Sequence, residues 1–87
     1  MMRYVLRKGS TILTVDGFDG YSHVENVLTF SHPLDILLYV RCEYKHTGLE
    51  FKLNDEMSHI YSRDENFINH FGSIHIVKKI TDIIKEE

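Results

Sequence analysis

Apolar and polar residues alternate across residues 35–54, and this pattern constrains the fold more than any other in the chain. Before a turn at Thr47-Gly48 the apolar positions are Ile36, Leu38, Val40, Cys42 and Tyr44, and after it they are Leu49, Phe51 and Leu53. A period of two predicts β-strands that bury one face. A two-residue loop at Thr47-Gly48 would also set Lys45 opposite Glu50. We therefore expect a β-hairpin, whose first strand, apolar on both faces at Leu37 and Tyr39, is central in a sheet or lies at an interface.

The N-terminal residues predict a second hairpin. A two-residue loop at Lys8-Gly9 would set Tyr4 opposite Leu13, Val5 opposite Ile12 and Arg3 opposite Thr14. The two Asp-Gly steps in residues 16–20 predict a turn or loop. Residues 23–30 fit both a strand and a helix; the strand is favoured, and Ser31-His32-Pro33 would end it.

The C-terminal third predicts helices. Residues 58–62 form a short extended piece, and the capping-box spacing from Ser62 to Glu65, with Gly72 as a stop, predicts a helix at 63–71. A stripe of isoleucine and valine predicts a further helix at 76–86, although Ile74, Ile76 and Ile80 also fit a strand, so residues 74–80 stay open between the two. The expected fold is a single α+β domain over residues 1–87, in which an antiparallel sheet of four or five strands (two hairpins) carries one or two C-terminal helices packed on one face.

Composition and charge exclude several classes of protein. The chain has 87 residues, one cysteine and a net charge of −3. It has no apolar run of the roughly 18 residues that a membrane span needs, and a lone cysteine suits a reducing compartment, so we expect a cytoplasmic protein without membrane contact. No stripe of basic residues indicates direct binding of nucleic acid. The absence of alanine, with frequent Ile, Lys and Asn, indicates an AT-rich genome, as in many viruses and mobile elements.

Metal and cofactor sites find no support in the spacing of the candidate ligands. Six histidines occur, but none of their spacings matches a zinc motif, and Cys42 is expected to be a small buried hydrophobe. Asp16 and Asp19 lack the remaining positions of a calcium loop. Glycine-rich phosphate loops are also missing. The sequence therefore predicts neither a metal nor a cofactor.

One short segment has the residue types of an acid–base catalyst. On an extended strand His59, Tyr61 and Arg63 would point to one side and supply a general acid or base, a second proton donor and a phosphate clamp. Such a set suits a small metal-independent ribonuclease, which is one alternative function.

The favoured function is non-enzymatic and depends on acidic residues that flank apolar ones. The expected partner-binding residues are Asp55, Glu56, Met57, Tyr61, Asp64 and Glu65. Carboxylates around an aromatic and aliphatic centre complement a basic protein surface. We therefore expect an inhibitor or accessory factor, encoded by a virus or mobile element, that occupies the basic, nucleic-acid-handling site of a host protein. The other alternative is a structural homo-oligomer, such as a homodimer with the 36–40 strand at its seam.

Overall fold

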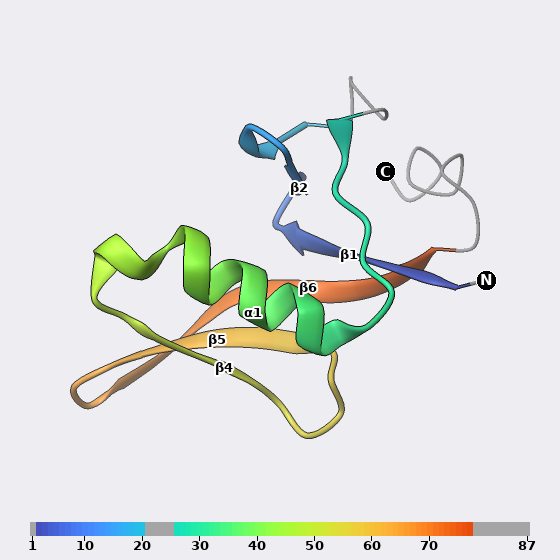
Figure 1. Cartoon of the computed structure of the whole chain (residues 1–87). Helices are drawn as coiled ribbons and strands as arrows, with labels where there is room; N and C mark the ends of the chain where they lie inside the picture. The colour runs from blue at the N-terminus through green and yellow to red at the C-terminus, as the bar shows by residue number, and fades with distance from the viewer. Residues whose placement is uncertain (1, 21–25, 78–87) are drawn as a thin grey trace.

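A computed structural model describes residues 2–20 and 26–77 of the chain. In these residues one six-stranded antiparallel sheet, in the order β3-β2-β1-β6-β5-β4, carries one α-helix on one face (Figure 1). The strands are β1 (Arg3–Lys8), β2 (Thr11–Thr14), β3 (Gly17–Asp19), β4 (Glu50–Leu53), β5 (His59–Asp64) and β6 (Phe67–Val77). The helices are α1 (Pro33–Glu43) and a short 3-10 turn, η2 (Lys45–Thr47). The α+β class is as expected from the sequence, but the sheet has more strands and α1 lies in the middle of the chain.

The strand predicted for residues 36–45 is wrong, because this segment forms α1 and the start of η2. His32 is the N-cap, and its Nδ1 accepts a hydrogen bond from the N–H of Leu34 at 3.1 Å. Pro33 occupies the first helical position, where its missing N–H costs nothing. Ser31-His32-Pro33, predicted to end a strand, therefore begins a helix. Gly48, with a φ of 73°, ends η2 in the left-handed conformation that glycine tolerates.

The buried residues explain why a helix forms here. Ile36, Leu37 and Val40 are buried, and their spacing of i, i+1 and i+4 is helical. Leu38, which a strand would place beside Ile36, is 60% exposed. Cys42 is exposed as well, which corrects the expectation that its thiol is buried. Ile36 and Val40 fit both the helical period and the strand period of two. The alternation alone therefore could not choose between a helix and a strand.

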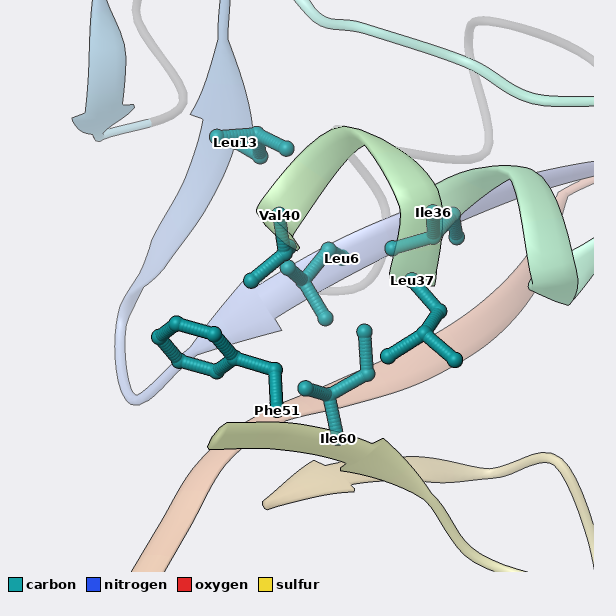
Figure 2. Close-up of a cluster of buried hydrophobic side chains, with 7 residues drawn as sticks. All are labelled: Leu6, Leu13, Ile36, Leu37, Val40, Phe51 and Ile60. Atoms are coloured by element: carbon teal, nitrogen blue, oxygen red, sulfur yellow. The ribbon is translucent and has the colours of Figure 1, made fainter. Parts of the chain in front are cut away.

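The main core lies between α1 and the sheet. Its seven buried side chains come from five elements, and Figure 2 shows them converging beneath the helix: Leu6, Leu13, Ile36, Leu37, Val40, Phe51 and Ile60. A smaller cluster of Val5, Ile12 and Val77, with Val27 packed against it, forms a separate group. Adjacent residues in β1 and β2 thus belong to different clusters, because side chains alternate across a strand.

The N-terminal hairpin exists, but its register differs from the prediction. Lys8 lies opposite Thr11 and Arg7 opposite Ile12, so the loop is Gly9-Ser10. The shift is two residues along the partner strand, which leaves every side chain on its expected face. Residues 17–19, predicted as part of a loop, form β3 beside β2.

Residues 26–30 fill a gap that opens between β1 and β2. On one side Phe30 and Tyr4 exchange two backbone hydrogen bonds of 2.8 and 2.9 Å. On the other side the N–H of Leu28 donates to the carbonyl of Leu13 at 3.1 Å. The segment makes two isolated bridges and no ladder, so the predicted strand is wrong for residues 26–30. The rest of that prediction, residues 23–25, lies outside the described residues.

A long hairpin replaces the helix predicted at 63–71. β5 pairs with β6 from His59 opposite Ser73 to Asp64 opposite Phe67, and Glu65 at the turn has a φ of 49°. The turn sequence Glu-Asn lacks the Asn-Gly signal that usually identifies a hairpin. The capping-box spacing therefore favoured a helix in the sequence analysis. Ile76 and Val77, the first residues of the helix predicted at 76–86, belong to β6; the remaining positions lie outside the described residues. β4 pairs with β5, not with residues 36–45 as predicted.

A bulge in β6 determines which side chains of this strand face the core. Ile60 lies opposite Gly72 and Tyr61 opposite His70, so Phe71 is an extra residue in β6. The ring of Phe71 contacts the rings of Phe51 and Tyr44, with centroids 5.0 and 5.3 Å away. A Cβ on Gly72 would stand 2.8 Å from the Cδ1 of Leu6, so only glycine fits there without displacement.

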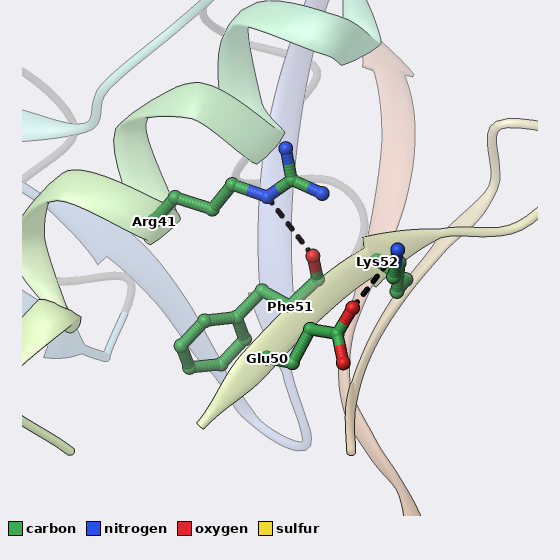
Figure 3. Close-up of polar contacts among 4 residues, drawn as sticks. All are labelled: Arg41, Glu50, Phe51 and Lys52. Atoms are coloured by element: carbon green, nitrogen blue, oxygen red, sulfur yellow. Dashed lines mark hydrogen bonds and ion pairs between the residues drawn. The ribbon is translucent and has the colours of Figure 1, made fainter. Parts of the chain in front are cut away.

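The edge strand β4 is covered by a side chain of α1. Arg41 donates from its Nε to the carbonyl of Phe51 at 3.0 Å, while Lys52 pairs with Glu50 at 3.0 Å (Figure 3). The Arg41 contact occupies a backbone acceptor that an edge strand would otherwise present to another chain.

We predict that Ile36→Ala and Leu38→Ala differ sharply in stability. Ile36 is fully buried in the core, so its truncation should lower the free energy of unfolding by about 2–5 kcal/mol. Leu38 is exposed on the helix, and its truncation should cost less than about 0.5 kcal/mol. Urea denaturation measures both. Equal losses would mean that residues 36–40 form a strand that buries both side chains.

We predict that Gly72→Ala destabilises the protein by about 1–3 kcal/mol, because the added methyl group presses on Leu6. Gly20→Ala is the matched control, since a Cβ there meets nothing within 4 Å. The melting temperature of Gly72→Ala should fall well below that of Gly20→Ala. Equal melting temperatures would contradict the close approach of β1 and β6.

Candidate functional site

The acidic residues expected to form one binding surface fall into two groups, at opposite ends of β5. Asp55, Glu56 and Met57 belong to the loop between β4 and β5, while Asp64 and Glu65 lie at the end of β5 and in the turn to β6. β5 separates the two groups by roughly 17 Å, at about 3.3 Å per residue. Figure 1 shows the two connections at opposite ends of the strands. Tyr61 lies between them, half-buried in β5.

A groove of about 320 Å³ lies next to the first of these groups. Glu56, Met57 and Ser58 of the β4–β5 loop line it together with residues from β1, β6 and the start of α1 with its N-cap: Tyr4, His32, Pro33, Ile74 and Ile76. Asn54 shapes the loop, because its Oδ1 accepts from the N–H groups of Ser58 and His59, both at 2.8 Å. Met57 adopts a φ of 58° inside this loop and is 41% exposed.

The second group lies at the hairpin tip, which we define as Asp64, Glu65, Phe67 and Ile68. Phe67 is 71% exposed and Ile68 is 66% exposed, the highest values among large hydrophobic side chains of the described residues. Ile68 lies opposite Arg63 and Phe67 opposite Asp64, so the tip is apolar on both faces of the hairpin. Sequence reasoning missed Phe67 and Ile68 because it placed them on the buried face of a helix.

Histidine and basic side chains gather on the face of the hairpin turned away from α1. His59, Tyr61 and Arg63 alternate along β5 with the buried Ile60 and Ser62, so they share this outer face as the sequence predicted. The structure adds His70, whose ring centroid lies 5.3 Å from that of His59. His59 and Arg63 are exposed on this face, and Tyr61 is half-buried.

Lys52 and Glu50 lie on β4 beside this outer face. A hydrogen bond and the positive charge of Lys52 lower the pKa of the Glu50 carboxyl. Lys52 lies opposite Tyr61 and Glu50 opposite Arg63. Acidic and basic charges are therefore interleaved on β4 and β5.

A second groove of about 320 Å³ lies between the β2–β3 turn and the end of α1. It is lined by Leu13, Val15, Asp16, Gly17, Tyr39, Glu43 and Tyr44. Burial, and then the negative charge of Glu43, raises the pKa of both Tyr39 and Tyr44. Both phenols line the groove, and a neutral phenol can donate a hydrogen bond.

The side chains of residues 2–20 and 26–77 do not bring three or more His, Cys, Asp or Glu residues together as a metal site. Within the same residues, no helix has the length and apolar character to cross a membrane.

No family model matches the chain, and no curated protein or solved structure is significantly similar to it. We therefore infer function from the side chains and their geometry.

We predict that Lys52→Met raises the pKa of Glu50, because it removes both the hydrogen bond and the charge that favour the ionised carboxylate. An NMR titration of the Glu50 side chain measures this. A lowered pKa stabilises the fold above the unfolded-state pKa, and that contribution disappears as the pH falls through the folded-state value. Lys45→Met, in η2, is the control and should leave the pKa of Glu50 unchanged. An unchanged pKa of Glu50 in Lys52→Met would contradict the conclusion that Lys52 lowers it.

Proposed function

We propose that this protein is a non-enzymatic protein-binding module that docks through the hairpin tip. The observation that carries the proposal is the pair of neighbouring side chains, Phe67 and Ile68, left 71% and 66% exposed at the end of a hairpin. Adjacent exposed apolar residues beside polar ones mark interaction sites more often than isolated ones do. Met57 and Tyr61, also expected from the sequence as binding residues, lie away from this tip.

Burial of the tip in a partner would contribute substantially to the free energy of binding. Full burial of a phenylalanine or isoleucine side chain contributes about 1.5–3 kcal/mol each. Loss of both contacts therefore weakens binding by about 100-fold or more. Phenylalanine is also enriched at the centres of protein interfaces. The hairpin end is convex, so the proposed partner presents a cleft.

The charges next to the tip indicate the chemistry of that cleft. Asp64 and Glu65 adjoin Phe67, while the charge of Arg63 is partly offset by Glu50 on the neighbouring strand. An apolar cleft edged by lysine and arginine complements this arrangement. Basic clefts are typical of proteins that handle nucleic acid. The proposal is thus an inhibitor or accessory factor, from a virus or mobile element, that acts on such a host protein in the cytoplasm.

The test compares tagged variants in a pull-down from nuclease-treated lysate of the native host, read by quantitative mass spectrometry. We expect the wild-type protein to enrich one host protein at near-stoichiometric amount, and Phe67→Ala/Ile68→Ala to lose it. Because both side chains are exposed, this double variant should keep its melting temperature. Leu38→Ala on α1 and Met57→Ala/Ile76→Ala in the groove are matched controls that remove exposed apolar surface elsewhere and should retain the partner.

Charge-reversal variants test which of the two acidic groups contributes to binding. Asp64→Lys/Glu65→Lys should weaken capture, most strongly at low salt, whereas Asp55→Lys/Glu56→Lys at the other end of β5 should not. Unchanged capture by Phe67→Ala/Ile68→Ala, or loss in the groove variant alone, would overturn docking through the tip. Recovery of the bait alone would overturn the protein-binding function and favour self-association, which light scattering at high protein concentration measures.

A further inference from the structure

Two histidines from different strands meet on the outer face of the hairpin, below its tip. The ring centroids of His59 and His70 are 5.3 Å apart, and the ring planes are inclined at 67°. Both side chains are exposed to solvent. They stand eleven residues apart in the sequence, so no local ligand motif connects them.

The bulge at Phe71 is what brings His70 to this face. Gly72 and Ile74 lie on the core side of β6, and strict alternation would place His70 on that side too. The extra residue reverses the alternation, so the ring of Phe71 joins the core while His70 comes opposite the outward-facing Tyr61. The two imidazoles are therefore juxtaposed by the same irregularity that fills the core.

The ring of His59 is held by a chain of hydrogen bonds. Its Nδ1 lies 2.8 Å from the Oγ of Ser58, and that oxygen also accepts from the Nδ2 of Asn54 at 3.0 Å. In the tautomer protonated at Nδ1, the hydroxyl of Ser58 accepts this hydrogen bond and the lone pair of Nε2 is left for a metal ion. His70 approaches a serine more loosely and through its other ring nitrogen, with Nε2 3.5 Å from the Oγ of Ser73, which leaves Nδ1 for a metal ion. A hydrogen bond to one ring nitrogen orients the other for a metal ion.

We propose that His59 and His70 form a two-imidazole site for a divalent transition-metal ion of the class of Zn²⁺, Ni²⁺ and Cu²⁺. Imidazole nitrogen is a preferred ligand of these ions. With Zn–N bonds near 2.0–2.1 Å and a tetrahedral angle, two bound imidazoles have ring centroids roughly 5 Å apart. The separation of 5.3 Å between His59 and His70 matches this geometry. Water, or a group from a partner, completes the coordination.

Two basic side chains and one carboxylate lie on β4 and β5 beside this position. Lys52 lies on the adjacent strand opposite Tyr61, but its ammonium is paired with Glu50 at 3.0 Å. Arg63 is two residues beyond Tyr61 along β5 and faces Glu50. Glu50 thus offsets only one of these two positive charges, so the two imidazoles must supply the affinity for the metal ion.

Isothermal titration calorimetry with zinc chloride tests the site directly. All variants carry Cys42→Ser, because the exposed thiol of Cys42 is itself a zinc ligand. The metal-free Cys42→Ser protein, at pH 7.5 in a non-chelating buffer, should bind one equivalent of Zn²⁺. His59→Gln and His70→Gln should each weaken this binding by at least about tenfold, since even the loss of an outer-shell partner can cost that much. Ser58→Ala should weaken it less.

His46→Gln is the matched control, because His46 is also exposed but stacks on Tyr44 in η2, away from the pair. It should bind zinc as the parent does, and all variants should melt at similar temperatures. NMR should show the ring protons of His59 and His70 shifting together during the titration. Zinc affinity that survives His59→Gln or His70→Gln, or the absence of saturable binding in the parent, would overturn the site.

Discussion

The face of α1 that carries Ile36, Leu37 and Val40 is buried against the sheet, and the positions of the other elements depend on this contact. Leu6 and Leu13 reach it from β1 and β2, and Phe51 and Ile60 reach it from β4 and β5. One short helix therefore joins both halves of the sheet. The rings of Tyr44, Phe51 and Phe71 extend the same core beyond the end of α1. Full burial of an aliphatic side chain contributes about 1.5–3 kcal/mol, which makes this layer the main source of stability in the described residues.

The short length of α1 has a consequence for the surface. Its eleven residues span roughly 16 Å at 1.5 Å per residue, whereas the eleven residues of β6 span roughly 35 Å at 3.3 Å per residue. The strands therefore extend beyond the helix, and the first four residues of β6 are exposed. This explains how Phe67 and Ile68 can remain uncovered while the rest of the sheet has a well-filled core. A tip without tertiary support is available for a partner.

The bulge at Phe71 connects the core to the outer face. It lets an aromatic ring enter the core beside Gly72, where a Cβ would press on Leu6 of β1. It also turns His70 outward, so that the His59–His70 pair exists only because β6 contains one extra residue. The proposed docking tip and the proposed metal site share one hairpin but use different side chains, and each can fail without the other.

The sequence by itself determined the α+β class, β4 through its alternation, an extended piece at 58–62 that covers most of β5, and the N-terminal hairpin apart from a two-residue shift. It also predicted that His59, Tyr61 and Arg63 would share a face on an extended segment, since side chains alternate along a strand, although it assigned Arg63 to a helix. The tertiary structure decided the conformation of residues 33–43, because Ile36 and Val40 satisfy both the helical and the strand period. It decided which residues meet across β5 and β6, including His59 with His70 and the separation of Asp55 from Asp64. Local periodicity reports which face a side chain occupies, but register, bulges and the choice of what covers the sheet depend on contacts between residues distant in the sequence.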